Sequence, residues 1–171
     1  AARRCDISRN GMVGADFGID GLIQECIVVS NNYRGFNMEN HAGGMIIMTA
    51  ICQEDIGSSG GVIERNEIAW NHGFGIWFDS CTNNVPRIIR NNYIHHNQRA
   101  GIMMERTRRG LIYNNLIVSN FGGGIDLSAS DQIQVFNNTL AANSGWVDLY
   151  VHGLPRTMCD NNGTIVWGSL V

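Results

Sequence analysis

The sequence predicts an all-β solenoid, a single domain of about six to seven stacked coils that spans residues 1–171. Three observations lead to this fold class: an internal repeat, short segments of alternating polarity, and the lack of any sustained helical stripe of apolar residues. Repeats of roughly 20 to 50 residues are typical of solenoids, because each copy forms one coil that stacks on its neighbours. With 44% hydrophobic residues, the chain can fill one continuous core.

The repeat is an Asn-x-apolar-x-x-Asn motif whose first Asn recurs at steps of 26, 23 and 23 residues. Its four copies are Asn66–Asn71, Asn92–Asn97, Asn115–Asn120 and Asn138–Asn143. Two earlier segments, Cys5–Asn10 and Cys26–Asn31, fit the same register with Cys at the first position. Buried amides need hydrogen-bond partners, so we expect both Asn positions to form ladders from coil to coil.

A glycine four residues after the second Asn opens a predicted strand in five of the six coils. The predicted strands are Gly14–Gly18, Gly35–Glu39, Gly75–Asp79, Gly101–Glu105 and Gly124–Ser128. Their alternating polarity predicts one buried and one outward face, and the Asn and Gly positions mark tight corners. The residues expected to face inward are Phe36 and Met38, Ile76 and Phe78, Ile102 and Met104, and Ile125 and Leu127. An apolar residue three positions before the first Asn completes the buried set: Ile63, Ile89, Ile112 and Val135.

Coils of this length, with Asn-x-Ile-x-x-Asn followed by a Gly-Ile strand, resemble right-handed parallel β-helix repeat proteins, the superfamily shared with pectate lyases. The resemblance covers nearly the whole chain and implies the fold. It implies activity only broadly, because members include polysaccharide lyases, glycoside hydrolases, uronan epimerases and phage tailspikes, and fold alone does not fix function. It implies a polysaccharide or oligosaccharide partner and an extracellular or cell-surface location.

Charge and hydropathy limit the classes of partner that we expect the chain to bind. The formal net charge of −3 leaves no electrostatic footprint for nucleic acid. No apolar run approaches the roughly 18 residues of a membrane-spanning helix, so no membrane partner is expected. The chain begins within a coil and ends after an expected partial coil at Met158–Ile165, without an obvious cap. We therefore expect a fragment of a longer chain, or ends covered by other copies, as a homo-oligomer or filament.

Five cysteines leave at least one thiol unpaired within a monomer. Cys5 and Cys26 occupy equivalent positions on neighbouring coils, about 4.8 Å apart, which suits either a disulfide or two stacked free thiols. Cys52 and Cys81 lie in irregular regions and are candidates for a clip between two loops, while the pairing of Cys159 stays open.

The regularity breaks at two places. Residues 40–60 are predicted to form a protruding insertion, within which Met45–Thr49 could add an irregular strand. A shorter excess, Ser80–Pro86, follows the strand that ends at Asp79. Insertions in repeat folds often gather on one face and carry the binding site. The outward residues beside these insertions are therefore the first candidates.

Two outward columns are expected on this face. One contains Asp16, Asn37, Trp77, Met103, Asp126 and Asp148, and the next contains Glu39, Asp79, Glu105 and Ser128. Stacked like charges are unfavourable in a sheet, so the Asp79 and Glu105 pair points to a function. Two carboxyls about 5 to 5.5 Å apart suit a retaining glycosidase, and a separation of roughly 6.5 to 9.5 Å suits an inverting one. Asp126 is the alternative second carboxylate, and the same oxygens could hold Ca²⁺.

Neighbouring side chains add substrate-binding candidates. Trp77 is expected to point outward as a platform for a sugar ring. Arg106 and Arg108 could bind a uronate or sulfate group. Glu39 and His41, at the start of the insertion, complete the predicted binding residues, with His41 as a base or loop anchor.

The leading functional hypothesis is hydrolysis of a polysaccharide by Asp79, Glu105 and Asp126. A Ca²⁺-dependent lyase, with Arg106 or Arg108 as the base, is one alternative; apart from that Ca²⁺, no cofactor or metal is expected. The other alternative is a structural or adhesive solenoid that assembles end to end, since contacts that do not close produce filaments.

Overall fold

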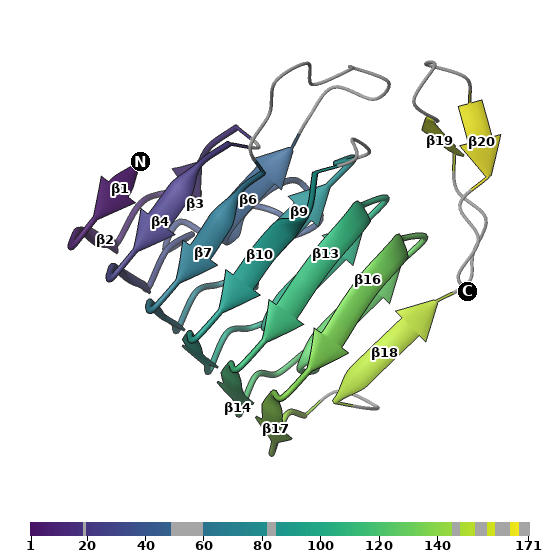
Figure 1. Ribbon diagram of the computed structural model, residues 1–171. Helices are drawn as coiled ribbons and strands as arrows, with labels where there is room; N and C mark the ends of the chain where they lie inside the picture. The colour runs from purple at the N-terminus through teal and green to yellow at the C-terminus, as the bar shows by residue number, and fades with distance from the viewer. Residues whose placement is uncertain are drawn as a thin grey trace.

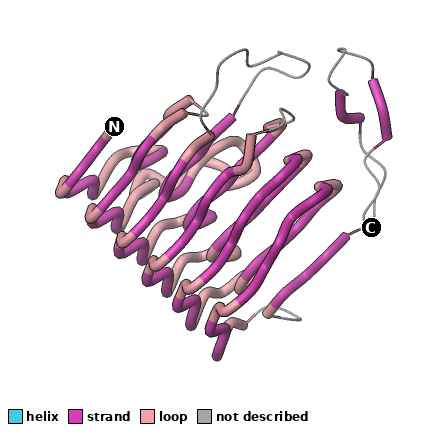
Figure 2. Tube along the Cα trace, viewed as in Figure 1, coloured by secondary structure: helices cyan, strands magenta, loops and turns pink. Residues whose placement is uncertain are grey.

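The computed structural model describes residues 1–18, 20–48, 60–81, 85–144, 148–152, 157–159 and 165–167. All regular elements in these ranges are strands, so they contain no helix that could cross a membrane. Three parallel six-stranded sheets wind into a solenoid of six coils, which confirms the predicted fold class (Figure 1). Each coil contributes one strand to every sheet, and short corners join the strands (Figure 2).

The strands of each sheet follow the order of the coils. The first sheet contains β1 (Ala2–Arg3), β4 (Leu22–Gln24), β7 (Val62–Glu64), β10 (Arg87–Arg90), β13 (Arg108–Tyr113) and β16 (Asp131–Phe136). The second sheet contains β2 (Asp6–Ser8), β5 (Ile27–Val29), β8 (Glu67–Ala69), β11 (Tyr93–His95), β14 (Leu116–Val118) and β17 (Thr139–Ala141). The third sheet contains β3 (Val13–Asp16), β6 (Gly43–Met48), β9 (Phe74–Asp79), β12 (Ile102–Glu105), β15 (Ile125–Ser128) and β18 (Leu149–His152).

Two Asn ladders run along the solenoid, as the repeat predicts. In the first, Asn66 Nδ2 donates to Asn92 Oδ1 at 2.9 Å, and Asn92 Nδ2 donates to Asn115 Oδ1 at 3.0 Å. Each of these oxygens also accepts a backbone N–H of the preceding coil, so the buried amides are satisfied. The second ladder follows the same pattern through Asn10, Asn31, Asn71, Asn97, Asn120 and Asn143.

The interior holds stacks of apolar side chains from all three sheets. Its members include Val28, Ile63, Ile68, Ile76, Phe78, Ile89, Ile94, Ile102, Met104, Ile112, Ile117, Ile125 and Leu127. Burying one such aliphatic side chain contributes about 1.5 to 3 kcal/mol. The inward positions predicted for β9, β12 and β15 are therefore confirmed.

The strand predicted at Gly35–Glu39 is wrong, because the third-sheet strand of that coil is β6. In β6, Met45 pairs with Ile76 and Ile46 with Trp77. The glycine that enters this strand is Gly44, where a Cβ would lie 2.4 Å from the carbonyl oxygen of the next coil. Consequently Phe36 is exposed rather than inward.

The predicted insertion at 40–60 contains β6, which belongs to the third sheet instead of protruding from it. The extra residues before β6 form a loop over 32–42. Asn32 shapes this loop, since its side chain accepts the Phe36 N–H at 2.8 Å and donates to the carbonyl oxygens of Phe36 and His72. The remaining part of the predicted insertion, 49–59, lies outside the described residues.

The structure also decides between alternatives for the cysteines and the chain end. Cys5 and Cys26 are stacked free thiols, with the Cys5 N–H donating to Cys26 Sγ at 3.4 Å. The thiol of Cys81 is buried and donates to the Ile47 carbonyl at 3.6 Å, while Cys52 lies outside the described residues. The partial coil expected at Met158–Ile165 is wrong, because β19 (Thr157–Cys159) pairs antiparallel with β20 (Ile165–Trp167).

Candidate functional site

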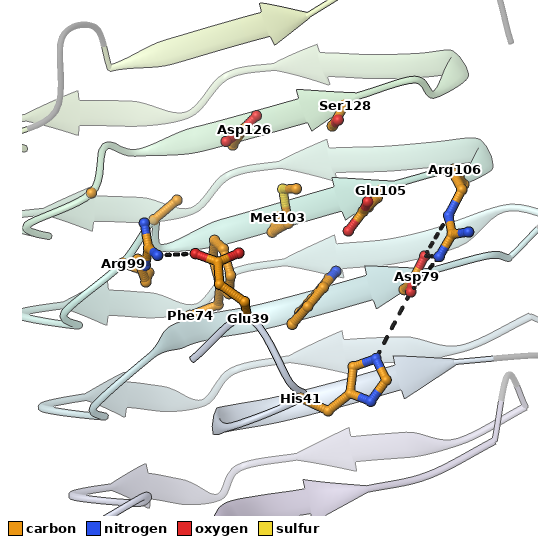
Figure 3. A pocket seen from close by; sticks show the side chains of 13 residues that line it. Glu39, His41, Phe74, Asp79, Arg99, Met103, Glu105, Arg106, Asp126 and Ser128 are labelled. Carbon is orange, nitrogen blue, oxygen red and sulfur yellow. Dashed lines mark hydrogen bonds and ion pairs between the residues drawn. The ribbon is translucent and has the colours of Figure 1, made fainter. Parts of the chain in front are cut away.

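A groove of about 440 Å³ runs over the outer face of the third sheet. It crosses β9, β12 and β15, and the 32–42 loop supplies one of its walls (Figure 3). Its lining residues are Glu39, His41, Phe74, Trp77, Asp79, Arg99, Ala100, Met103, Glu105, Arg106, Gly122, Asp126 and Ser128. Seven of the eight residues predicted from the sequence as catalytic or substrate-binding thus lie around one groove.

Strand register fixes two columns on the floor of the groove. Trp77, Met103 and Asp126 are in register in one column, and Asp79, Glu105 and Ser128 are in register in the next. The predicted columns are confirmed for these six residues. Asp16 also lies in the first column, because it pairs with Ile46, which pairs with Trp77. The columns are wrong at three positions, because Ile46 takes the place expected for Asn37, Met48 that of Glu39, and Tyr150 that of Asp148.

Asp79 forms a bidentate ion pair with Arg106. Arg106 Nε and Nη2 lie 3.0 and 2.8 Å from Asp79 Oδ1, and Nη2 is also 2.8 Å from Oδ2. The Ser80 hydroxyl donates to the same carboxylate at 3.0 Å, and His41 Nε2 lies 3.9 Å away. Only 3% of Asp79 is exposed. Its carboxylate is therefore fixed by charge-assisted hydrogen bonds.

Glu105 and Asp126 lie on neighbouring coils but are displaced along their strands. Glu105 is opposite Ser128, two residues beyond Asp126. A rung spacing of about 4.8 Å and a rise of about 3.3 Å per residue place the two backbone positions about 8 Å apart. Glu105 is 7% exposed, whereas Asp126 is only partly buried. The two carboxyls thus differ in their access to solvent.

Trp77 is outward-facing but covered, in contrast to the exposed platform expected from the sequence. It is 5% exposed, with the His41 ring 5.2 Å and the Phe74 ring 5.0 Å from its own ring, between centroids. Among the described residues, no partner accepts a hydrogen bond from its buried Nε1. The loop residue His41 is thus the side chain that closes over Trp77.

The 32–42 loop is tied down across the groove from Asp79. Glu39 forms an ion pair with Arg99 on the loop before β12. The Arg99 guanidinium carbon also lies 6.0 Å from the centre of the Phe74 ring, within cation–π range. Glu39, which was predicted at the end of a strand, and His41, which was predicted on the insertion, therefore both reach the groove from the 32–42 loop.

Arg108 is the predicted site residue that does not line the groove. Its Nε donates to Asp131 Oδ1 and Oδ2 at 3.1 and 3.2 Å, and both side chains belong to the first sheet. Arg99 is a lining residue that the sequence analysis missed. The signal was a column two residues before the strand glycine, where Gly73, Arg99 and Gly122 are equivalent and only Arg99 is charged.

The part of the chain that the structure describes contains no evident group of metal-ligand side chains. No three His, Cys, Asp or Glu side chains converge there as ligands. The Ca²⁺ considered from the sequence stays a prediction.

Comparison with known proteins identifies the family. The model of the right-handed β-helix region matches residues 48–162, more than half of the chain. No match is found among curated proteins. A solved structure, a double mutant of the periplasmic alginate epimerase AlgG, is similar with a TM-score of 0.57 at 20% identity; the match covers 80% of this chain and 29% of the epimerase chain. This chain thus spans under a third of that structure, and the likeness concerns the fold. The chain belongs to the right-handed parallel β-helix family.

Proposed function

We propose that the chain binds a polysaccharide along the third-sheet groove and hydrolyses its glycosidic bonds, with Glu105 and Asp126 as the acid and base pair. The observation that carries the proposal is their diagonal placement in one groove. Their backbone positions are about 8 Å apart, which is compatible with the separation of roughly 6.5 to 9.5 Å between two carboxyls that inverting glycosidases use to admit a water molecule.

The two carboxyls take different roles because of their surroundings. Glu105 is the more buried and donates its proton to the glycosidic oxygen as the bond from the anomeric carbon to that oxygen breaks. Asp126 has more access to solvent and accepts a proton from the water that attacks the anomeric carbon. One water is consumed per bond, and exchange with solvent returns both carboxyls to their starting states.

Asp79 has a positioning role in this scheme instead of the catalytic role predicted from the sequence. Its two oxygens are engaged by Arg106, which makes it a poor proton carrier and a good anchor for the corner beside Glu105. The lyase alternative is less well supported by the same contacts. Arg106 would have to leave Asp79, and Arg108 would have to leave Asp131, before either could act as a base.

The fold neighbour guides the choice of substrates and compartment. That protein is a periplasmic alginate epimerase, so a polysaccharide outside the cytoplasm is the expected substrate class. A test incubates the full chain with neutral, amino-sugar and uronic acid polymers, alginate included. Released reducing ends report hydrolysis, unsaturated products report a lyase, and NMR of the sugar ring protons reports epimerisation.

Matched variants test the assigned residues. We expect Glu105→Gln and Asp126→Asn each to lower the hydrolytic rate by about 10² to 10⁴ fold. Glu67→Gln makes the same change as Glu105→Gln on the outer face of the second sheet and should leave the rate unchanged. Activity that survives both groove substitutions, or a product that retains the anomeric configuration, contradicts the proposal. Filaments in electron micrographs, with no product from any polymer, would favour the structural alternative instead.

A further inference from the structure

We infer that Trp77 binds an N-acetylated glycan in this groove, with its indole N–H as the donor to the carbonyl oxygen of an acetamido group. Segment 37–41 covers this donor in the structure and has to move aside for the glycan. The inference rests on the glycan-binding part of the proposed function and names a binding group and a substrate class for the same groove. It concerns the indole nitrogen, whereas the platform role predicted from the sequence concerns the face of the ring.

Trp77 carries a buried hydrogen-bond donor that lacks an acceptor. The side chain lines the groove, and the residue is 5% exposed. Within the described ranges its Nε1 has no hydrogen-bond partner, and the same is true of Arg99 Nε in the same groove. Nearly all buried polar groups in native proteins are hydrogen-bonded, so each exception needs an explanation. A ligand that brings acceptor oxygens into the groove supplies one.

The surroundings of Trp77 favour one kind of acceptor. The residue belongs to a buried apolar cluster that is separate from the interior core and consists of Ile46, Phe74, Trp77, Ala100 and Met103. The other side chains of this cluster contain no oxygen or nitrogen acceptor, so a sugar hydroxyl bound there would bring a proton without a partner. A carbonyl oxygen accepts without donating, and the methyl group of an acetyl substituent can pack on the apolar cluster. An acetamido group therefore fits better than a hydroxyl.

Segment 37–41 forms local hydrogen bonds in the described part of the chain. The Asn40 N–H donates to the Asn37 carbonyl at 3.0 Å, and the Glu39 N–H donates to Asn37 Oδ1 at 3.0 Å. After the segment, the Gly43 N–H donates to the Met12 carbonyl of another coil at 3.1 Å and fixes the start of β6. The bonds within the segment can therefore be kept when it moves relative to the sheet.

Two side chains hold the segment over the groove (Figure 3). Glu39 forms an ion pair with Arg99, and these side chains are 60% and 39% exposed. The His41 ring lies 5.2 Å from the Trp77 ring, and its Nε2 is 3.9 Å from Asp79 Oδ2, beyond hydrogen-bonding distance. Exposed ion pairs stabilise little. Few contacts are therefore lost when the segment moves aside and uncovers the indole N–H.

Hydrogen exchange at the indole N–H tests the cover without a ligand. The resonance is assigned by its loss in Trp77→Phe, and its exchange with solvent is followed by NMR in the full chain. Glu39→Gln removes one anchor and should speed this exchange by about two- to fivefold, the factor expected for loss of an exposed ion pair. Glu25→Gln makes the same change at the exposed pair with Arg4 and should leave the exchange rate unchanged. An unchanged rate in Glu39→Gln as well contradicts the cover.

Two oligosaccharides that differ in one substituent test the acceptor. Chitohexaose carries an acetamido group where cellohexaose carries a hydroxyl. Calorimetric titration should show chitohexaose binding at least about tenfold more tightly, because its carbonyl satisfies the donor without adding an unpaired proton. It should also move the Trp77 indole resonance of the wild type downfield. Trp77→Phe keeps an aromatic ring without the N–H and should remove the preference, whereas Trp70→Phe, at an exposed tryptophan, should preserve it.

The inference is overturned if the two hexamers bind equally, if cellohexaose binds more tightly, if neither binds, or if chitohexaose leaves the indole resonance in place. Because that resonance is measured in the wild type, the test holds even if Trp77→Phe does not fold. The proposed function has its own readout, the products of the polymer screen and the Glu105→Gln and Asp126→Asn variants. Hydrolysis of another polymer without binding of chitohexaose thus sinks only the inference, and binding of chitohexaose at Trp77 without hydrolysis of any polymer sinks only the proposed hydrolysis.

Discussion

The ion pair between Asp79 and Arg106 lines the groove, and we expect it also to stabilise the solenoid. Its side chains are 4% and 24% exposed, respectively, and the guanidinium engages both carboxylate oxygens. We predict that Arg106→Gln destabilises the fold, because it takes the guanidinium away from a buried carboxylate that still accepts a hydrogen bond from the Ser80 hydroxyl. The change removes the charge while it keeps a polar side chain of similar reach.

The expected loss in the free energy of unfolding depends on how deeply each side chain of the pair is buried. Removing one partner of a fully buried pair costs about 3 to 5 kcal/mol, because an uncompensated charge remains. Water can reach the Arg106 side, so we expect the lower end of that range, about 3 kcal/mol, for Arg106→Gln. Asp79→Asn should cost about 2 kcal/mol, since the arginine that it leaves behind can be solvated. The double variant should cost much less than the sum, which gives a coupling free energy of about 2 kcal/mol.

Urea unfolding followed by circular dichroism measures these free energies, with the slope of each transition checked against that of the wild type. The control is a second cycle on Arg4 and Glu25, an ion pair with side chains 83% and 35% exposed. Exposed pairs contribute about 0 to 1 kcal/mol, so this coupling should be small. Equal coupling in the two cycles, or less than about 0.5 kcal/mol at Asp79 and Arg106, would refute the reasoning.

Three further predictions concern the scaffold. Asn97→Ala should lower the free energy of urea unfolding by about 3 kcal/mol, because it leaves the Asn71 N–H and the Ile68 carbonyl without their hydrogen-bond partner. Asn143→Ala, at the partly exposed end of the ladder, should lower it by about 1 kcal/mol. Equal losses would contradict the ladder argument. Gly44→Ala should lower the melting temperature more than Gly18→Ala, because its Cβ would meet a backbone oxygen at 2.4 Å while that of Gly18 meets nothing within 4 Å; the reverse order would contradict the register of β6. Burial lowers the pKa of His95 below its ordinary value of 6.5, and nearby Glu67 opposes this shift. As the pH falls through 6.5, the unfolded chain therefore takes up the proton first, and the stability of the native state drops by at most about 1.4 kcal/mol per pH unit. A His95→Gln variant whose stability keeps the same dependence on pH would count against this prediction.

The scaffold could be predicted from the sequence because its determinants repeat. The Asn ladders, the inward isoleucines and the glycine that opens each third-sheet strand recur with fixed spacing, so one reading is checked by several coils. The prediction went wrong in the coil that contains β6, where Gly35 has the expected spacing from Asn31 but the strand lies at Gly43–Met48. The apolar run from Met45 to Met48 was the better signal, since β6, like β9, is buried along nearly its whole length.

The groove was predicted less completely, because its walls depend on contacts that no repeat encodes. Register alone places Asp79, Glu105 and Asp126 on one face. It does not reveal that the 32–42 loop folds back over Trp77, nor that Glu39 binds Arg99 from another coil. Such contacts depend on the path of a single irregular loop, and one sequence holds no second copy of that loop for comparison.

The corner after each third-sheet strand explains why the chain tolerates stacked carboxylates. Ser80, Arg106 and Ala129 are equivalent there, and all three have positive φ, at 59°, 47° and 49°. This left-handed corner lets Arg106 reach back by one coil to Asp79, which neutralises one of the two like charges that the strand register brings together. The sequence cue for catalysis, a pair of stacked acids, is therefore partly a structural device. In the proposed mechanism, catalysis depends on the diagonal pair formed by Glu105 and Asp126, which belongs to neither the Asn ladders nor the apolar core.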